Sequence, residues 1–354
     1  MKILMLVNWK IEYCDRIPVD KQPPDYYVKG IPYWFFRYFE EKPEVDVVDV
    51  SSFSWLEKFE KNKLRFYIWQ TLRVLPRLRK YDLIVSHGMQ SGILLSLIRR
   101  FFNTKAKHIV FDIGSFNSAA ESGVAHRLMQ FASKSIDGII YHTRSQIDYY
   151  KKCFPWIVEK SKYIRFGADI EFFCSEELEY NNEKGSYIVC VGVSKLDKDT
   201  LVKAYKRIKT NIKLRLIGHV DPKYQEIPGI EQLPYIPVNE LINHIYNSLF
   251  CVLPFEYHNR SYGQMRLLHQ MALGKAVIAA KVPSLVDYAE DGKTALFYEA
   301  QNVEMLAECI KKLLDEPDLA DTIGRNAKGF LINACNESVM ALDIEKEFKH
   351  VVGS

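Results

Sequence analysis

The segment Ser261–Ala280 holds the residues whose types and spacing most suggest chemistry. It predicts a helix capped at Ser261 after a loop of small residues, then a turn at Gly274 and a short buried strand. A helix that opens beside Gly263 presents free backbone N–H groups and the positive end of its dipole, which favour a bound phosphate. The donors of this cradle would be the backbone N–H groups of Gly263, Gln264 and Met265. A nucleotide diphosphate is therefore a sensible ligand, although every α/β protein contains strand–loop–helix–strand units.

Two further candidates stand where predicted strands of the first half end. His87 follows the strand Leu83–Ser86, and Asp112 closes the strand His108–Asp112. Ligands of open α/β sheets bind beyond the carboxyl ends of the strands. We therefore predict that His87 and Asp112 lie beside a substrate.

Alternating strands and helices must position these groups. The expected strands are Lys2–Val7, Val45–Val50, Leu83–Ser86, His108–Asp112, Gly138–His142, Lys162–Ile164, Tyr187–Val191, Lys213–Ile217, Phe250–Leu253 and Ala276–Ala280. Helical patterns in the first half are Pro32–Glu41, Asn62–Leu78, Gly92–Phe102, Ala125–Lys134 and Arg144–Cys153. This alternation predicts the α/β class, with parallel sheets that are covered on both faces.

The polar run Ser175–Gly185 carries no apolar periodicity and predicts a linker between two doubly wound domains. We expect an N-terminal domain over residues 1–172 and a C-terminal domain over residues 173–335. Residues 336–354 are expected to form a helix that packs across the domain boundary. Two such sheets that face each other would enclose a cleft suited to a reaction of two substrates.

Charge is unevenly placed along the chain. The formal net charge is only +4, yet residues 1–170 carry 27 basic against 18 acidic side chains. Within Lys58–Lys80, eight basic residues and one acidic residue are interleaved with aromatic residues. A basic aromatic helix is attracted to an anionic membrane surface, and the alternative is a solvated helix face above a core. Nucleic acid is not an expected partner, because the second half is acidic and no binding module is recognised.

The seven cysteines are scattered without a Cys-x-x-Cys pair. This usage favours reduced thiols in the cytoplasm and disfavours a zinc site or a disulfide framework. The longest apolar stretch, Gly92–Ile98, is far shorter than a membrane span.

Five segments occur in an order and spacing that is typical of one large family. They are Ile164–Phe173, Gly192–Lys198, Leu216–Gly218, Ser261–Ala280 and Asp287–Phe297. With them the chain resembles the retaining glycosyltransferases of family 4 (glycosyl transferases group 1), most strongly from Tyr187 to Ala327. The resemblance implies the glycosyltransferase-B fold, in which two Rossmann-like domains face each other across a cleft.

The resemblance also implies how the donor is bound. Gly192 and Lys198 match a loop in which a lysine neutralises the phosphates of the donor. The family usually has an arginine where this chain has Val193, and Lys195 is a stand-in for it.

The chain departs from the family at a pair of glutamates that usually flank the signature helix. Ser261 and His269 take these positions, eight residues apart. His269 could hydrogen-bond the ribose or be a core histidine, and Ser261 could be an N-cap alone. Glu256, in the loop before the helix, could replace the first glutamate or be a solvated carboxylate.

The expected function is transfer of a sugar from a nucleotide diphosphate sugar to a hydroxyl acceptor, with the anomeric configuration retained. The catalytic candidates are Asp112, Glu256 and His87. A lipid-linked or cell-surface glycan is the preferred acceptor, and peripheral binding to the inner face of the membrane is the expected setting. No cofactor is expected, and no essential metal, because the chain has no Asp-x-Asp triplet. Two alternatives stay open: a non-catalytic scaffold or partner subunit of similar fold, and a sugar-nucleotide epimerase.

Overall fold

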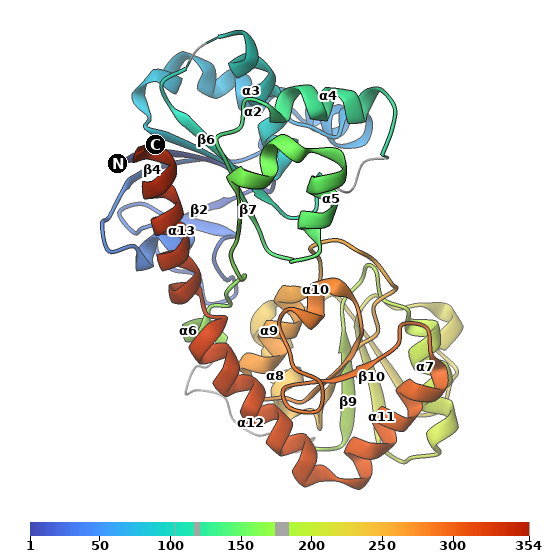
Figure 1. The fold of residues 1–354 in the computed structure, drawn as a ribbon. Coiled ribbons are helices and arrows are strands. Elements are labelled where there is room, and N and C mark those ends of the chain that lie inside the picture. Colours follow the sequence, from blue (N-terminus) through green and yellow to red (C-terminus); the bar gives the residue numbers. More distant parts are fainter. Residues whose placement is uncertain (103, 117–120, 174–183, 354) are drawn as a thin grey trace.

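The computed structural model describes residues 1–102, 104–116, 121–173 and 184–353. In this part of the chain, two six-stranded sheets form an N-terminal and a C-terminal lobe (Figure 1). All strand pairs are parallel, and helices flank each sheet. The predicted α/β class with two doubly wound, Rossmann-like domains is confirmed.

The N-terminal sheet has the strand order β4-β1-β5-β6-β7-β8. Its strands are β1 (Lys2–Leu6), β4 (Glu44–Val48), β5 (Leu83–His87), β6 (Lys107–Asp112), β7 (Gly138–Tyr141) and β8 (Ser161–Tyr163). The apolar run of β1 is buried from Ile3 to Leu6, as expected of a central strand with both faces covered. The strand order reverses between β1 and β5.

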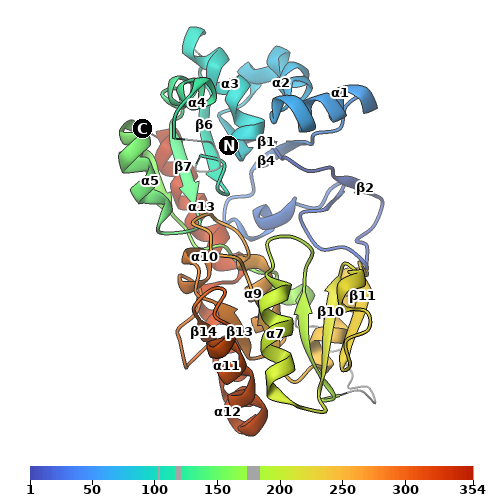
Figure 2. The same ribbon diagram turned by 90° about the vertical axis from the view of Figure 1, so that its right-hand side faces the viewer.

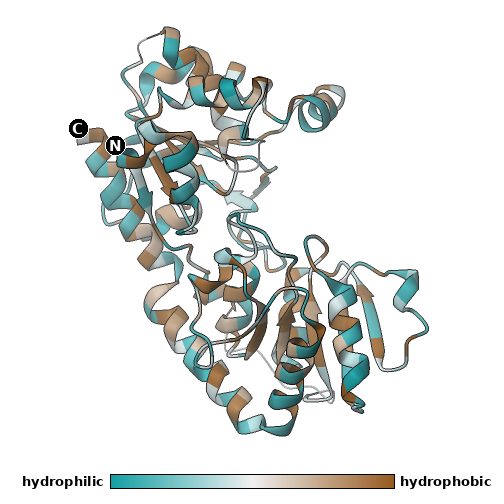
Figure 3. Ribbon diagram, turned by 45° about the vertical axis from the view of Figure 1, so that its right-hand side comes forward, coloured by the Kyte–Doolittle hydropathy of each residue, from teal (hydrophilic) through white to brown (hydrophobic). Residues whose placement is uncertain are grey.

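The C-terminal sheet has the strand order β11-β10-β9-β12-β13-β14. Its strands are β9 (Tyr187–Val191), β10 (Lys213–Gly218), β11 (Ile230–Pro234), β12 (Cys251–Leu253), β13 (Val277–Ala280) and β14 (Leu296–Tyr298). This is the strand order of the dinucleotide-binding Rossmann fold, and it reverses between β9 and β12. Figure 3 shows these strands mostly in the hydrophobic colour, inside helices with hydrophilic outer faces.

Helices connect the strands within each lobe. Those of the N-terminal lobe are η1 (Trp34–Tyr38), α1 (Ser54–Phe59), η2 (Glu60–Leu64), α2 (Ile68–Val74), η3 (Leu75–Lys80), α3 (Met89–Phe101), α4 (Val124–Ser133), α5 (Gln146–Cys153) and η4 (Pro155–Lys160). The C-terminal lobe contains α6 (Ile170–Phe173), α7 (Lys198–Ile208), η5 (Pro222–Tyr224), α8 (Val238–Asn247), α9 (Gln264–Ala272), α10 (Pro283–Val286), α11 (Val303–Asp315) and α12 (Pro317–Ala334). A small parallel pair, β2 (Glu12–Cys14) and β3 (Tyr26–Val28), lies in the long loop after β1.

The last helix, α13 (Glu337–Gly353), returns to the N-terminal lobe (Figure 1). Its residues Met340, Ile344 and Phe348 are buried in one hydrophobic cluster with the strands β1, β5 and β6. The chain passes between the lobes twice, near Ala168 and near Asn336, and the two segments are hydrogen-bonded to each other. Ala168 N donates to Cys335 O (2.8 Å), and Glu337 N donates to Ala168 O (3.0 Å).

Two expected helices of the N-terminal lobe are wrong in extent. The pattern Pro32–Glu41 forms only the short 3-10 helix η1. The pattern Asn62–Leu78 is broken, because Arg65 has a left-handed backbone (φ 60°) and Pro76 cannot donate a helical hydrogen bond. Lys58–Lys80 therefore runs from the end of α1 through the short helices η2, α2 and η3 and is not one basic helix.

The expected linker, Ser175–Gly185, lies mostly outside the described residues, as does part of the polar run after Gly114. Among the helices that the structure describes, none has the length and apolar character that crossing a membrane requires.

Candidate functional site

A cavity of about 540 Å³ lies between the two lobes, and we call it the interlobe cavity. Its N-terminal wall consists of Asn8, Trp9, Pro24, Asp25, Trp34, His87, Ile113, His142 and Phe166. Its C-terminal wall consists of Ser261, Tyr262, Gly263, Gln264, Met265, Arg266 and His269. Six of the predicted site residues, from both domains, therefore meet in one place: His87, Ser261, Gly263, Gln264, Met265 and His269.

The cavity lies where both sheets reverse their strand order. In the N-terminal sheet, Trp9 follows β1 and His87 ends β5, and their ring centroids are 4.6 Å apart. In the C-terminal sheet, Gly192 follows β9, and the loop after β12 leads to α9. Carboxyl strand ends at a topological switch point are the usual ligand site of such sheets.

The C-terminal wall is built around the start of α9. Gly263 has a left-handed backbone (φ 94°), and a Cβ atom there would lie 2.7 Å from Cζ of Phe255, so the position requires glycine. The first helical hydrogen bond runs from Leu267 N to Gly263 O (3.2 Å). The N–H groups of the preceding turn therefore point out of the helix end, where an anion can accept from them.

The prediction that Ser261 caps this helix is wrong. The helix begins at Gln264 with Gly263 as its N-cap residue. Ser261 Oγ instead accepts a hydrogen bond from Gln264 Nε2 (2.6 Å), which also donates to Thr143 Oγ1 (3.0 Å). Ser261 and Gln264 thus tie the C-terminal wall to the N-terminal lobe.

Arg266 is a cavity residue that the sequence analysis missed. It stands on the first turn of α9, and its guanidinium donates to Ser194 O and Tyr262 Oη, each at 3.3 Å. A Cβ atom on Gly192 would lie 2.6 Å from Cζ of Arg266, so the guanidinium covers the turn after β9. No carboxylate of the described residues forms an ion pair with Arg266. A cation held beside a helix N-terminus is a suitable partner for phosphate.

The residues of the β9–α7 loop that are predicted to bind the sugar donor differ in whether they line a cavity. Gly192 is buried beneath Arg266. Lys195 lines an adjoining cavity of about 480 Å³, together with Tyr257, His258 and Ser115. Lys198 is the first residue of α7 and lines neither cavity.

His269 lies on the cavity face of α9. Its ring stacks on Phe173, with centroids 3.9 Å apart and an angle of 22° between the planes. Burial lowers the pKa of His269 to about 3, so its imidazole is neutral near pH 7. A neutral imidazole is able to hydrogen-bond a hydroxyl group but cannot pair with a phosphate.

The prediction of Asp112 as a catalytic or sugar-binding carboxylate is not supported by the geometry. The side chain is fully buried. Oδ1 accepts from Gly114 N (3.0 Å), Ser115 N (2.6 Å), Ser115 Oγ (2.8 Å) and Phe116 N (3.3 Å), whereas Oδ2 accepts from Gln146 Nε2 (3.0 Å) and Tyr150 Oη (2.5 Å). These donors use the lone pairs of the carboxylate, so we assign Asp112 to holding the loop after β6.

The other two catalytic candidates differ in access to the cavity. His87 lines it and is 7% exposed, and its Nδ1 atom is buried without a hydrogen-bond partner. Burial, with a contribution from His142, lowers the pKa of His87 to about 3, which makes it a weak base. Glu256 is exposed and lines neither cavity, and its backbone N donates to Lys195 O (3.1 Å).

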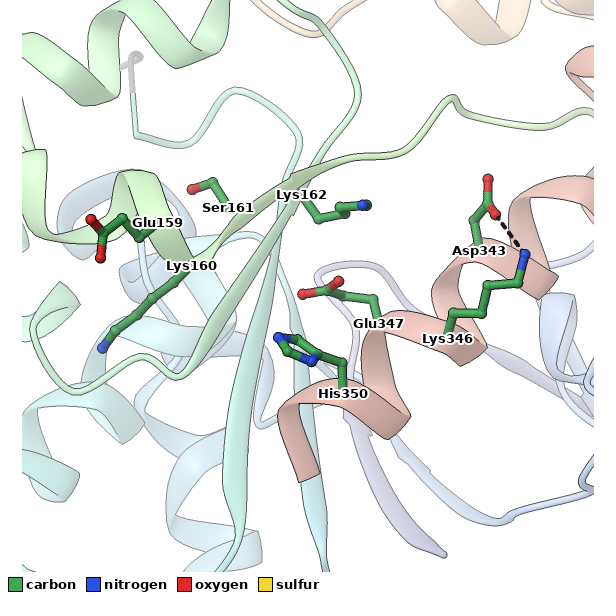
Figure 4. A pocket seen from close by; sticks show the side chains of 8 residues that line it. All are labelled: Glu159, Lys160, Ser161, Lys162, Asp343, Lys346, Glu347 and His350. Carbon is green, nitrogen blue, oxygen red and sulfur yellow. Dashed lines mark hydrogen bonds and ion pairs between the residues drawn. The ribbon is translucent and has the colours of Figure 1, made fainter. Parts of the chain in front are cut away.

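A third hollow, of about 470 Å³, lies between the η4–β8 segment and α13 (Figure 4). Its side chains carry both signs of charge, and Lys346 pairs with Asp343 at 3.4 Å. This mixture favours no single ligand. In the described part of the chain, no group of three or more His, Cys, Asp or Glu side chains is placed to hold a metal ion.

Comparison with solved structures identifies the architecture. HepE of Anabaena, solved in complex with UDP, superposes with a TM-score of 0.70 at 12% sequence identity, over 98% of this chain and 99% of that one. The chain thus has the glycosyltransferase-B fold.

Comparison of the sequence identifies the C-terminal domain. Residues 185–316 match the model of the family described as glycosyl transferases group 1. It is 25% identical over 162 residues to the capsular polysaccharide biosynthesis glycosyltransferase CapM of Staphylococcus aureus, a match that covers 42% of this chain and 41% of CapM. It is 30% identical over 165 residues to an uncharacterized glycosyltransferase of Methanocaldococcus jannaschii, covering 44% of this chain and 46% of the relative. The chain thus matches less than half the length of these curated relatives.

Proposed function

We propose that this protein transfers a sugar from a nucleotide diphosphate sugar to a hydroxyl group of a glycan, with the anomeric configuration retained. The observation that carries the proposal is the C-terminal wall, where the start of α9 lies beside Arg266, whose guanidinium has no carboxylate partner among the described residues. The match to the glycosyl transferases group 1 model and the names of the relatives support it.

Departure of the nucleotide diphosphate concentrates negative charge on the leaving phosphate. The N–H groups at the start of α9 and the Arg266 guanidinium stabilise this charge in the transition state, because they are in place before the reaction. Lys195 and Lys198 add positive charge from the neighbouring loop in our proposal.

Among the residues that line the interlobe cavity, Asp25 is the only carboxylate, and burial raises its pKa. Asp112 is fully engaged by internal donors. Apart from Asp25, this set offers no carboxylate that could act as a covalent nucleophile, which favours direct front-face transfer assisted by the leaving phosphate.

The acceptor and the setting are also part of the proposal. CapM is named for capsular polysaccharide biosynthesis, and by analogy we propose a lipid-linked or cell-surface glycan as acceptor. The region around α1 and α2 lies at the end of the N-terminal lobe that is far from the C-terminal lobe (Figure 2). There Phe53, Trp55 and Phe59 are 58%, 69% and 47% exposed beside the basic residues of Lys58–Lys80. Exposed aromatic and basic side chains together suit the surface of an anionic bilayer.

Calorimetry and a donor panel test the function. Nucleoside diphosphates with different bases are titrated into the protein, and donor hydrolysis is then measured with several sugars on the base that binds. We expect one diphosphate to bind with micromolar affinity and one donor to be hydrolysed slowly. If no nucleoside diphosphate binds, the proposal is wrong and the scaffold alternative is favoured. If one binds but no donor is turned over in the presence of any glycan, the chain is a nucleotide-binding scaffold.

Vesicle sedimentation tests the membrane setting. The protein should bind vesicles with 30% phosphatidylserine at low salt and release them as salt rises, as about 1 kcal/mol per basic side chain near the surface implies. Trp55→Ser should weaken this binding. Equal binding to neutral vesicles, or none to either, contradicts the setting.

A further inference from the structure

We propose that Trp9, supported by the buried Trp34, forms a stacking surface for an uncharged sugar ring of the acceptor, and that His87 Nδ1 hydrogen-bonds one of its hydroxyl groups. The inference rests on the proposed function and specifies the acceptor side of the same cavity. It concerns the N-terminal wall, opposite the start of α9.

Trp9 is half-buried and supplies most of the ring surface that a ligand can contact, whereas Trp34 is only 5% exposed and packs against it. Trp9 Nε1 donates to Pro24 O (3.2 Å), and Trp34 Nε1 donates to Glu337 Oε1 (2.9 Å). The ring centroids lie 6.0 Å apart with 84° between the planes, so the rings form a corner. Since both polar edges have internal partners, apolar ring surface is what remains for contact with the apolar face of a sugar ring.

No lining residue of the N-terminal wall is a cation near pH 7, and its one acidic side chain, Asp25, would repel an anion when ionised. Burial lowers the pKa values of His87 and His142, which keeps both imidazoles neutral. The cation of the cavity, Arg266, stands on the C-terminal wall. A phosphate or carboxylate of the acceptor would therefore lose its hydration at the N-terminal wall without an ionic partner, which favours a neutral ring there.

The backbone conformation of Trp34 supports a ligand-binding role. Its φ of 49° lies in the left-handed region, which bulky residues avoid. The conformation is held by Glu337, which accepts from Trp34 and also pairs with Arg37 at 2.9 Å. Arg37 pairs in turn with the buried Asp169 at 2.8 Å. Strain that the surrounding structure holds in place is concentrated at ligand sites, and here it orients a cavity-lining ring.

His87 supplies a polar group next to the rings. Its imidazole is 4.6 Å from the ring of Trp9, and its Nδ1 is buried with no partner among the described residues. Buried polar atoms nearly always have a hydrogen-bond partner, so an unpartnered imidazole nitrogen on a residue that lines the cavity is a candidate to bind a ligand group. A hydroxyl suits a neutral imidazole nitrogen as either donor or acceptor.

Saturation-transfer NMR of the full chain, saturated with the nucleoside diphosphate that calorimetry selects, tests the stacking surface. The probes are the neutral methyl glycosides of glucose, galactose, mannose and N-acetylglucosamine, with glucose 6-phosphate and glucuronate as anionic comparators. We expect at least one neutral glycoside to bind more tightly than both anions. Trp9→Leu should weaken its binding fivefold or more, and Trp9→Phe should restore part of it.

The control is Phe101→Leu, which changes an aromatic residue of the same lobe that is 72% exposed and does not line the cavity. It should leave glycoside binding unchanged. Affinity for the nucleoside diphosphate should stay within twofold in every variant, which also shows that each variant is folded. Unchanged glycoside binding in Trp9→Leu, or tighter binding of the anionic probes, overturns the inference. So does the lack of binding of every neutral glycoside by a protein that binds nucleotide, whereas absence of nucleotide binding refutes the proposed function itself.

Discussion

The two walls of the interlobe cavity present different kinds of group. The C-terminal wall offers backbone N–H groups and the guanidinium of Arg266, whereas the N-terminal wall offers aromatic rings and neutral imidazoles. An anion is best stabilised on the first wall and an uncharged ring on the second. The difference teaches that the two walls of one cavity can favour ligand groups of different charge.

The largest expected effect is on ligand binding at the C-terminal wall. Arg266→Ala should weaken binding of the nucleoside diphosphate by ten- to a hundredfold, because a hydrogen bond to a charged group contributes about 1.5–3 kcal/mol. Arg266→Lys keeps the charge but loses the fork of donors, so its loss should be smaller. Calorimetry measures both. Equal affinities for the wild type and Arg266→Ala would show that the two walls do not differ in the way that we infer.

The second prediction concerns Glu337, which holds Trp34 in the N-terminal wall. Burial, with Asp169 nearby, raises the pKa of Glu337 to about 7 from the usual 4.5. Protons therefore bind the folded state more tightly, and this stabilisation is complete below pH 4.5 and is lost as the pH rises through about 7. Wild-type protein should lose roughly 1–3 kcal/mol more than Glu337→Gln between pH 5 and pH 8.

Urea unfolding at both pH values measures this difference. The groups that face Glu337 are Arg37, Asp169 and Trp34, and all three are unchanged in the variant. The same pH dependence in the wild type and in Glu337→Gln would contradict the assignment.

The smallest effect is expected at Lys198. If this lysine pairs with a donor phosphate, Lys198→Ala weakens donor binding, and its place outside the cavity lining implies a loss of about 1 kcal/mol. Lys203→Ala, on the exposed side of the same helix, is the matched control. A loss larger than that of Arg266→Ala would show that the β9–α7 loop, and not Arg266, contributes most to binding the donor phosphates.

The sequence was sufficient for the central strands and for the start of α9. Runs such as Ile3–Leu6 are apolar at every position, which is a strong signal of strands covered on both faces. The edge strands β11 and β14 were not predicted. The first carries Glu231 and Gln232 and is half-buried, and the second has only three residues, so neither gives a clear pattern.

The site was predictable in place but not in detail. Glycines and strand ends indicated where a ligand binds, because these features are local. Whether a side chain is free depends partly on distant partners: Oδ2 of Asp112 accepts from Gln146 and Tyr150, which lie more than thirty residues away. Arg266 was missed because a single polar residue on an amphipathic helix gives no signal of its own. Trp9 was missed because its loop has no periodic pattern, and Trp34 because it lies in Pro32–Glu41, whose pattern predicts a helix and gives no sign of a ligand.

The return of α13 to the first lobe has a consequence for biosynthesis. Met340, Ile344 and Phe348 complete a cluster whose other members, such as Phe36 and Phe111, are made hundreds of residues earlier. During translation the core of the N-terminal lobe therefore stays incomplete, with an apolar groove exposed, until α13 has been synthesised. Shielding of that groove by a chaperone during translation would be a natural requirement for a good yield of native protein.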